Sequence, residues 1–328
     1  LYSDWNDRIS TKFKYTSYEM EEDDASYGDD FFPEMNITIT DPDSGDRDNV
    51  FLGGDRYSGA NLINVESEFL TFKADFDNDD HIYTVGFERD DSEVVNLFIA
   101  RYNGEVRFRS FDDYKNGIWS RLRIHEPYAG HDAVGTMAAD FEVDKTSLYW
   151  QDKWFVKSDL TVLFGVRYDA VETPIAPDTN VNFVKEYGFS NASKFDFDLL
   201  QPRFSFNADV SDLFANNANI IAATFRGGKG LFMGRIPRVW YGNAYSRTGA
   251  TGDYRGWFSY DPTASNFPGP MPKGDPTAFW LSSPDSYYVV PDGSNPYGVA
   301  QSTDPNFEAP SSYRTSLGLI YCSIMAGR

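Results

Sequence analysis

The stretch from residue 234 to residue 311 concentrates the side chains best suited to binding a ligand. It is dense in Gly, Pro, Tyr and Asn, which indicates a long loop, and its aromatic rings lie among arginines. Rings supply contact area, and guanidinium groups hydrogen-bond polar or anionic groups. The alternative is that the rings let the loop pack upon itself. The predicted ligand-binding residues are Trp240, Tyr241, Tyr245, Arg247, Tyr254 and Trp257.

No residue pattern indicates catalysis or a bound metal. No Ser-His-Asp or paired-carboxylate arrangement stands out from the 50 acidic residues, and the three histidines lack paired spacing. Cys322 is the only cysteine, which excludes an internal disulfide and a Cys-based metal site. Asp41, Asp43, Asp46 and Asp48 could bind a divalent cation, although such a run is usually a solvated surface. We therefore expect no enzyme activity, metal or cofactor.

The elements that must position the loop residues are strands, and residues 147–173 show them best. From Leu160 to Tyr168 the apolar residues share one parity, with Leu163 the one exception, and Thr161, Gly165 and Arg167 take the other. This period of two predicts a strand with one apolar and one polar face. The preceding segment alternates in the same way apart from Asp152 and Phe155, and only residues 157–159 separate the two. They should pair as an antiparallel hairpin.

Composition supports an extended, aromatic-rich protein. Of the 328 residues 17% are aromatic, although the formal net charge is -21 and the mean hydropathy is -0.49. Such an aromatic content argues against disorder. No apolar run is long enough for a membrane helix, which leaves an alternating membrane barrel open. The negative charge and the lack of a basic patch argue against a nucleic-acid partner.

The predicted strands are joined by connections that alternate between short and long. Further strands are expected at 8–20, from about 61 to 76, from 83 toward 98, and around 203–210, 221–228 and 313–321, with a short helix at 110–116. In an up-and-down sheet, alternate connections lie at opposite ends, so all the long ones fall together. That is the layout of an outer-membrane barrel. The predicted long extracellular loops are about 21–60, 99–137, 174–196 and 234–311.

Three groups of motifs carry a resemblance to a known family. The hairpin contains Tyr149-x-Gln151-Asp152-x-Trp154, then Leu160-Thr161 and Gly165-x-Arg167-Tyr168-Asp169, and it resembles the barrel of TonB-dependent outer-membrane receptors. Residues 187–191 (YGFSN), 198–204 (DLLQPRF) and 226–232 (RGGKGLF) are similar to the Oar-like subgroup of those receptors. Together these motifs cover roughly residues 60 to 250.

The resemblance implies a receptor in the outer membrane of a Gram-negative bacterium. A ligand, unknown here, is captured by the extracellular loops and imported through a plugged barrel of about 22 strands, powered by the TonB complex. This chain shows eight or nine strands and no plug domain or TonB box, so we expect a fragment of one barrel domain, with its partners, the plug and the TonB complex, outside it. Lumen-facing residues that would contact the plug or the substrate are Arg167, Asp169, Arg203 and Arg226.

Two other functions remain open at the level of sequence. The first is a soluble or surface-anchored β-rich protein that binds glycans through the aromatic loop. The second is a passive porin or purely structural barrel. In the receptor interpretation, the apolar parity led by Leu160, Val162 and Phe164 faces lipid, Thr161, Gly165 and Arg167 face the lumen, and residues 157–159 form a periplasmic turn.

Overall fold

The computed structural model describes residues 1–23, 33–126, 135, 137–217, 219–249, 254–259, 263, 270 and 300–323. For residues 124, 126 and 254–259 it describes the backbone alone. The protein is mainly antiparallel β-sheet, as predicted, and consists of a nine-stranded and a five-stranded sheet with a few short helices. No helix in these ranges is long and apolar enough to cross a membrane.

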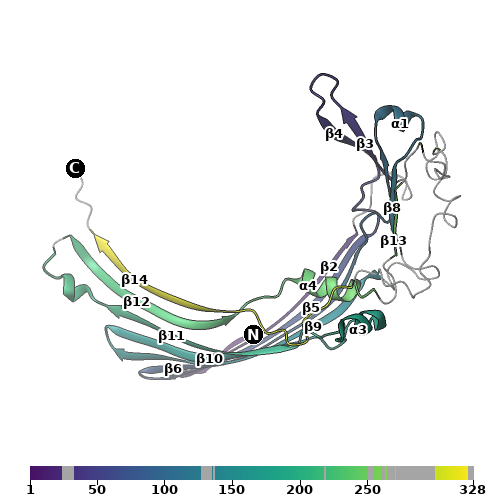
Figure 1. Ribbon diagram of the computed structural model, residues 1–328. Helices are drawn as coiled ribbons and strands as arrows, with labels where there is room; N and C mark the ends of the chain where they lie inside the picture. The colour runs from purple at the N-terminus through teal and green to yellow at the C-terminus, as the bar shows by residue number, and fades with distance from the viewer. Residues whose placement is uncertain are drawn as a thin grey trace.

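The nine-stranded sheet is curved and runs in an up-and-down order (Figure 1). Each strand pairs antiparallel with its neighbours. Its two edges, β1 and β14, have one partner each among the described strands. In spatial order the strands are β1 (Tyr2–Asn6), β2 (Ile9–Asp23), β5 (Asn61–Asn78), β6 (His81–Phe98), β9 (Ala139–Lys157), β10 (Leu160–Glu172), β11 (Phe197–Asp209), β12 (Ile220–Met233) and β14 (Ser311–Ser323).

The predicted segregation of short and long connections is confirmed. Short turns join β1 to β2, β5 to β6 and β9 to β10, and a connection containing the 3-10 helix η1 (Ser211–Phe214) joins β11 to β12. Asp79, in the β5–β6 turn, has a left-handed φ of 54°. The four long connections all leave from the other end of the sheet, where α3 (Val181–Tyr187), α4 (Arg238–Ser246) and the second sheet gather (Figure 1).

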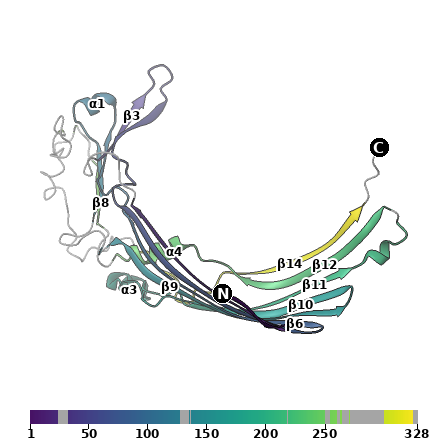
Figure 2. The ribbon, with the colours of Figure 1, turned by 180° about the vertical axis from the view of Figure 1, so that it is seen from behind.

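The two faces of the large sheet differ as the alternation predicts. In both views α4 lies within the curve of the sheet, on its concave face (Figures 1 and 2). Phe141 of β9 packs against this helix, and residues of the same parity, such as Tyr149, share its face. Residues paired directly across strands lie on the same face, so Arg167, opposite Tyr149, is also concave. Val166 and its apolar neighbours lie on the convex face.

The predicted long loops contain more regular structure than the sequence indicates. Segments from three of them form a five-stranded sheet in the order β13-β8-β7-β3-β4, in which β3 and β7 pair in parallel. The predicted helix at 110–116 is present as α1. The elements are β3 (Glu34–Thr40), β4 (Arg47–Gly53), β7 (Glu105–Phe108), α1 (Phe111–Lys115), β8 (Arg121–Glu126) and β13 (Tyr254–Ser259).

The five-stranded sheet has its own apolar core on one face. Ile37, Val106, Phe108 and Trp119 are almost fully buried there. Helix α1 covers part of this core because Tyr114 packs edge-on against Phe108, with ring centroids 5.4 Å apart. Local alternation explains the burial, since Ile37 and Phe108 are register partners on β3 and β7. The opposite face is polar.

Candidate ligand site on the concave face of the large sheet

Helix α4 forms the centre of the candidate site. It begins after Pro237 without a side-chain cap, and its sequence includes Gly242, so its intrinsic helix propensity is weak. Packing compensates for this weakness. Tyr241 and Ala244, spaced by three residues on one face, are 4% and 3% exposed against the concave surface of the sheet. The helix is therefore held by its contacts with β9 and its neighbours.

Aromatic rings join α4 to the strands beneath it. The ring of Tyr241 stacks on Phe141, with centroids 5.7 Å apart, and lies 4.4 Å from Phe195. Tyr245 packs on Phe141 at 5.3 Å, and its hydroxyl donates to the carbonyl of Ile175. Burial raises the pKa of both tyrosines, so their hydroxyls stay protonated. These rings form the floor of the site.

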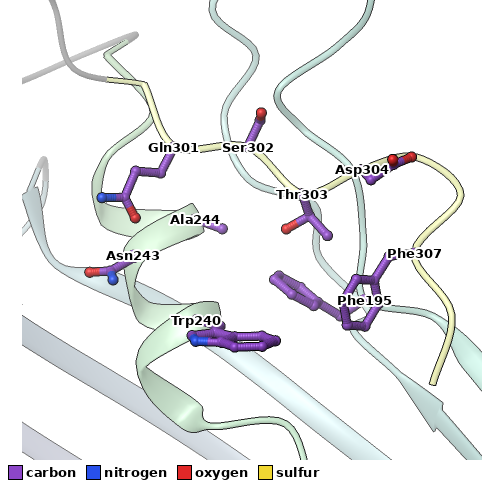
Figure 3. A pocket seen from close by; sticks show the side chains of 9 residues that line it. All are labelled: Phe195, Trp240, Asn243, Ala244, Gln301, Ser302, Thr303, Asp304 and Phe307. Carbon is purple, nitrogen blue, oxygen red and sulfur yellow. The ribbon is translucent and has the colours of Figure 1, made fainter. Parts of the chain in front are cut away.

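One side of α4 borders a cavity of about 260 Å³ (Figure 3). Trp240, Phe195 and Phe307 line it with rings, and Trp240 is 49% exposed. Phe307 meets both other rings close to edge-on, at 5.8 Å from Phe195 and 6.5 Å from Trp240. This wall offers an apolar surface on which a flat ligand face could stack.

The opposite wall of the cavity is polar. The amides of Asn243 and Gln301 lie together on one side, and the hydroxyl of Thr303 and the carboxylate of Asp304 lie above the rings (Figure 3). The segment that supplies Gln301 is tied to the helix end, because its backbone N–H donates to the carbonyl of Arg247 at 2.8 Å. A ring-shaped ligand with hydrogen-bonding edges matches this division of apolar and polar walls.

A second cavity, of about 330 Å³, lies between α4 and strands β5 and β6. Arg238 and Arg247 line it from the two ends of the helix, and Asn61 and Asn96 line it from the strands. Asn243 borders both cavities. The helix thus separates two adjoining cavities, and two arginines line the second of them.

The structure brings four of the six predicted ligand-binding residues together. Trp240 and Arg247 line the two cavities, whereas Tyr241 and Tyr245 pack beneath them. Tyr241 and Tyr245 therefore have a packing role, and ligand binding by Trp240 and Arg247 stays a prediction. Tyr254 and Trp257 lie elsewhere, in β13 of the five-stranded sheet, where their backbones pair with β8.

Sequence reasoning missed several lining residues. Phe195 and Phe307 come from two different predicted loops, and nothing in their local sequence indicates that they meet. Asn243 sits inside the aromatic stretch and could have been chosen from its helical spacing to Trp240. Gln301 and Asp304 follow a long segment, and only the fold places them beside α4.

Farther along the concave face, the predicted lumen residues form a polar network. Arg167 donates from Nε to Asp169 at 2.7 Å and from Nη2 to Glu88 at 2.6 Å. The same Nη2 lies 2.8 Å from the hydroxyl of Ser147, and the guanidinium covers the ring of Tyr149 at 5.5 Å. Three strands, β6, β9 and β10, are thereby linked by one side chain.

The network continues onto β11 and β12. Gln201, 1% exposed, donates to Asp169 at 2.7 Å and accepts from Arg203 at 3.1 Å and from the backbone of Met233 at 2.9 Å. Arg226, the fourth predicted lumen residue, shares this face but is exposed, and within the described residues its side chain has no ion pair. The structure thus groups three of the four residues.

The YGFSN segment, residues 187–191, has a structural role near the site. Gly188 ends α3 with a left-handed φ of 76°, which glycine adopts without strain. Asn191, fully buried, donates to the carbonyl of Asp178 at 2.9 Å and accepts from the backbone of Asn180 at 2.7 Å. Asn180 in turn donates to the carbonyl of Thr248, just beyond α4. These amides fix the third long connection to the fourth.

The acidic run is a turn rather than a ligand cage in the described structure. Asp41 accepts from the backbone N–H groups of Ser44 and Asp43 in the β3–β4 hairpin, and these bonds lower its pKa. Within the described ranges no group of His, Cys, Asp or Glu is arranged to hold a metal ion. His81 pairs with Asp152 at 2.9 Å, and His131 lies outside the described residues.

Comparisons of the chain with protein-family models, with curated proteins and with solved structures find no match.

Proposed function

We propose that the nine-stranded sheet is part of the wall of an outer-membrane β-barrel, in a TonB-dependent receptor that captures a ligand with its extracellular loops and imports it. The observation that carries this proposal is an exposed apolar belt on the convex face. Soluble proteins rarely expose so large a continuous apolar surface, and a lipid bilayer would cover it.

The belt follows from strand register. Phe72 of β5 lies opposite Phe13 and Phe87, and Val85 of β6 lies opposite Trp150 of β9. The same row continues across the sheet. Its exposed members include Phe13, Tyr15, Phe72, Phe76, Val85, Leu148, Trp150, Trp154, Tyr168, Leu200, Phe204, Leu317, Leu319 and Tyr321. Seven of the nine strands, all except β1 and β12, therefore contribute these exposed residues to one apolar surface.

Two charged residues fall within the belt, and both have partners. Asp152, 3% exposed, pairs with His81, whose ring stacks between Tyr83 and Trp154. Lys229 places its ammonium 5.7 Å from the ring of a tyrosine on β14. A charge that is buried beside a partner or lies against an aromatic ring is compatible with a lipid-facing surface. Barrels also place aromatic rings at the boundary between lipid and water, and these rings would suit such a position.

The belt stops at a row of charges on the side of the long connections. On the convex face Glu68 pairs across strands with Asp91, Asp91 with Asp144, and Asp144 with Glu172. Arg89 bridges Asp91 and Asp144 at 2.5 and 2.8 Å. A change from rings to carboxylates at one level of four adjacent strands is typical of the boundary between lipid and water.

The remaining features agree with a receptor. Away from α4 the concave face is polar, as a lumen is. Helix α4 with its two cavities lies at the long-loop end, where extracellular ligands would arrive. Among the described strands, β1 and β14 have one partner each, and further barrel strands would pair with their outer edges. A soluble glycan-binding protein would share the cavity beside Trp240 but would have no use for the belt.

Heat modifiability of the detergent-extracted protein tests this proposal. We expect the protein in the outer-membrane fraction, with different gel mobility before and after boiling. Partition with soluble material and identical mobility would refute the membrane assignment. To separate a receptor from a porin, growth on a limiting nutrient should require both this protein and the TonB complex. Growth that requires the protein but not TonB would favour the passive barrel.

A further inference from the structure

A cavity of about 450 Å³ lies on the polar face of the five-stranded sheet, away from α4. Four arginines line it: Arg47, Arg107, Arg109 and Arg121. The neutral groups beside them are hydroxyls and an amide, and none of the described lining residues is acidic. This concentration of positive charge is unusual in a chain whose formal net charge is -21.

Strand register places the arginines together. Arg107 of β7 lies directly opposite Arg121 of β8, so two like charges are cross-strand neighbours. Such pairs are destabilising in an antiparallel ladder. On the other side of β3, Thr40 faces Arg47 of β4, and Thr38 faces Asn49. Arginines from β4, β7 and β8 thus line one cavity.

The buried carboxylates of this sheet, Glu105 and Glu34, are engaged by other arginines. Glu105, 2% exposed, accepts from Arg101 at 2.6 Å, and Arg123 lies 3.7 Å away. Glu34 is paired with Arg56 at 2.9 Å. Arg121 approaches Glu105 only to 3.9 Å. The carboxylates therefore balance a cluster of arginines that does not include Arg47 or Arg107.

Part of the positive charge of the cavity, that of Arg47 and Arg107, has no acidic partner among the described residues. In the part of the chain that the structure describes, neither Arg47 nor Arg107 makes an ion pair. Burial lowers the pKa of Arg121, and the positive charges of Arg123 and Arg107 lower it further. This mutual repulsion would be relieved by an anion placed between the guanidinium groups.

We propose that this cavity binds a tetrahedral oxyanion group, a phosphate or sulfate, carried by a small solute. A carboxylate has two oxygens, which one or two guanidinium groups saturate. A phosphate or sulfate offers oxygens in several directions and can accept from arginines on three strands at once. The hydroxyls of Thr38 and Ser120 and the amide of Asn49 suit the uncharged remainder of the solute. The volume fits a small ligand.

This site does not depend on the membrane proposal, because it lies on the sheet formed by the long connections. The test uses the purified full chain in detergent at constant ionic strength, with calorimetry as the readout. The probes are inorganic phosphate, inorganic sulfate, glucose 6-phosphate, glucose 6-sulfate, glucuronate and glucose. We expect saturable binding of the phosphate and sulfate compounds, weaker binding of glucuronate and none of glucose.

Arg107→Ala and Arg47→Ala should each weaken binding about tenfold or more, because each removes a charge-assisted hydrogen-bond donor. The matched control is Arg8→Ala, which removes an arginine paired with Asp79. Both residues lie in short turns of the nine-stranded sheet, at the end opposite its long connections. Arg47 is exposed at the start of edge strand β4, so its replacement should leave the sheet folded. Circular dichroism checks that.

Three results would overturn the proposal. The first is no saturable binding of any phosphate or sulfate probe by the wild-type chain. The second is binding that Arg8→Ala weakens as much as Arg47→Ala does. The third is glucuronate binding as tight as that of glucose 6-phosphate, which would remove the preference for a tetrahedral group. Heat modifiability is unaffected by all three, so failure here leaves the membrane proposal standing.

Discussion

Arg167 reaches across strand β9 to hydrogen-bond Glu88, with its Nη2 atom 2.6 Å from Oε2, although β10 and β6 are not neighbours. The same guanidinium holds Asp169 through Nε. Because Asp169 is 3% exposed, its charge depends on this arginine, on Gln201 and on Lys145. The concave face is thus cross-linked perpendicular to the strands by side chains as well as by backbone ladders.

Arg167→Ala should lower the free energy of unfolding by about 3 kcal/mol, because it removes one of the partners of the buried Asp169 carboxylate and the only link to Glu88 among the described contacts of this network. Arg226→Ala, on the same face but without an ion pair among the described residues, should change it by less than about 1 kcal/mol. Urea unfolding of the detergent-solubilised protein gives both values. Equal effects of the two substitutions would show that the network contributes no specific stabilisation.

Gly86→Ala should destabilise the sheet by about 1–3 kcal/mol, because an added Cβ would lie 2.0 Å from Cζ of Tyr149 on the paired strand. The ring of Tyr149 occupies the space that Gly86 leaves. Tyr149→Ala in the Gly86→Ala background should recover part of the loss, a coupling that a double-mutant cycle measures. Strictly additive effects would contradict this explanation.

Tyr241→Ala should loosen α4, at a cost of about 3 kcal/mol or more to the local opening free energy, because its buried ring packs on Phe141 and Phe195. Trp240→Ala is the matched control, since that ring is half-exposed beside the cavity and its loss should leave the helix docked. Hydrogen exchange of the α4 amides distinguishes the two. Faster exchange in both variants would mean that Trp240 also holds the helix.

Glu105 should make the five-stranded sheet sensitive to acid. Burial raises the pKa of its carboxyl, but the hydrogen bond and charge of Arg101, together with Arg123 and Arg56, outweigh burial and hold the pKa below the usual range. The stabilisation is therefore complete above the unfolded-state pKa of about 4.3 and is lost as pH falls through the folded-state value. The pKa of Glu34 shifts in the opposite direction. Burial raises it by more than the charge and hydrogen bonds of Arg56 lower it.

Glu105→Gln should lower the opening free energy of the five-stranded sheet by about 2 kcal/mol at neutral pH. It should also reduce the loss of hydrogen-exchange protection that β7 and β8 show as the pH falls. Glu34→Gln should cost less, because its burial already disfavours the charged form. Hydrogen exchange, corrected for the intrinsic effect of pH on exchange, reports both. An unchanged acid profile in Glu105→Gln would assign the loss to other carboxylates.

The sequence predicts the large sheet well because each of its strands carries its own signal. The hairpin at 147–173 shows why: alternation alone placed Arg167 on one face and Val166 on the other, and the observed register agrees. Short and long connections could likewise be sorted from strand order. Local periodicity is sufficient here because the strands of this sheet lie side by side in the order in which they follow one another along the chain.

The five-stranded sheet and the cavities could not be predicted in this way. Strand β7 has four residues, too few to show a period, and it pairs in parallel with β3 from another long connection. The cavity beside Trp240 joins residues from two connections that meet only in the folded chain. Arg107 and Arg121 become neighbours through cross-strand register, and neither spacing nor composition reveals that pairing.

The most direct test of the membrane proposal is a comparison of Phe204 with Ser205, adjacent residues on opposite faces of β11. Nitroxide labels at Phe204→Cys and Ser205→Cys, in a Cys322→Ser background, are measured in reconstituted vesicles with oxygen and a water-soluble nickel complex as relaxing agents. We predict that oxygen relaxes the label at 204 and the nickel complex relaxes the label at 205. Access of the nickel complex to both labels would contradict a lipid-facing convex surface.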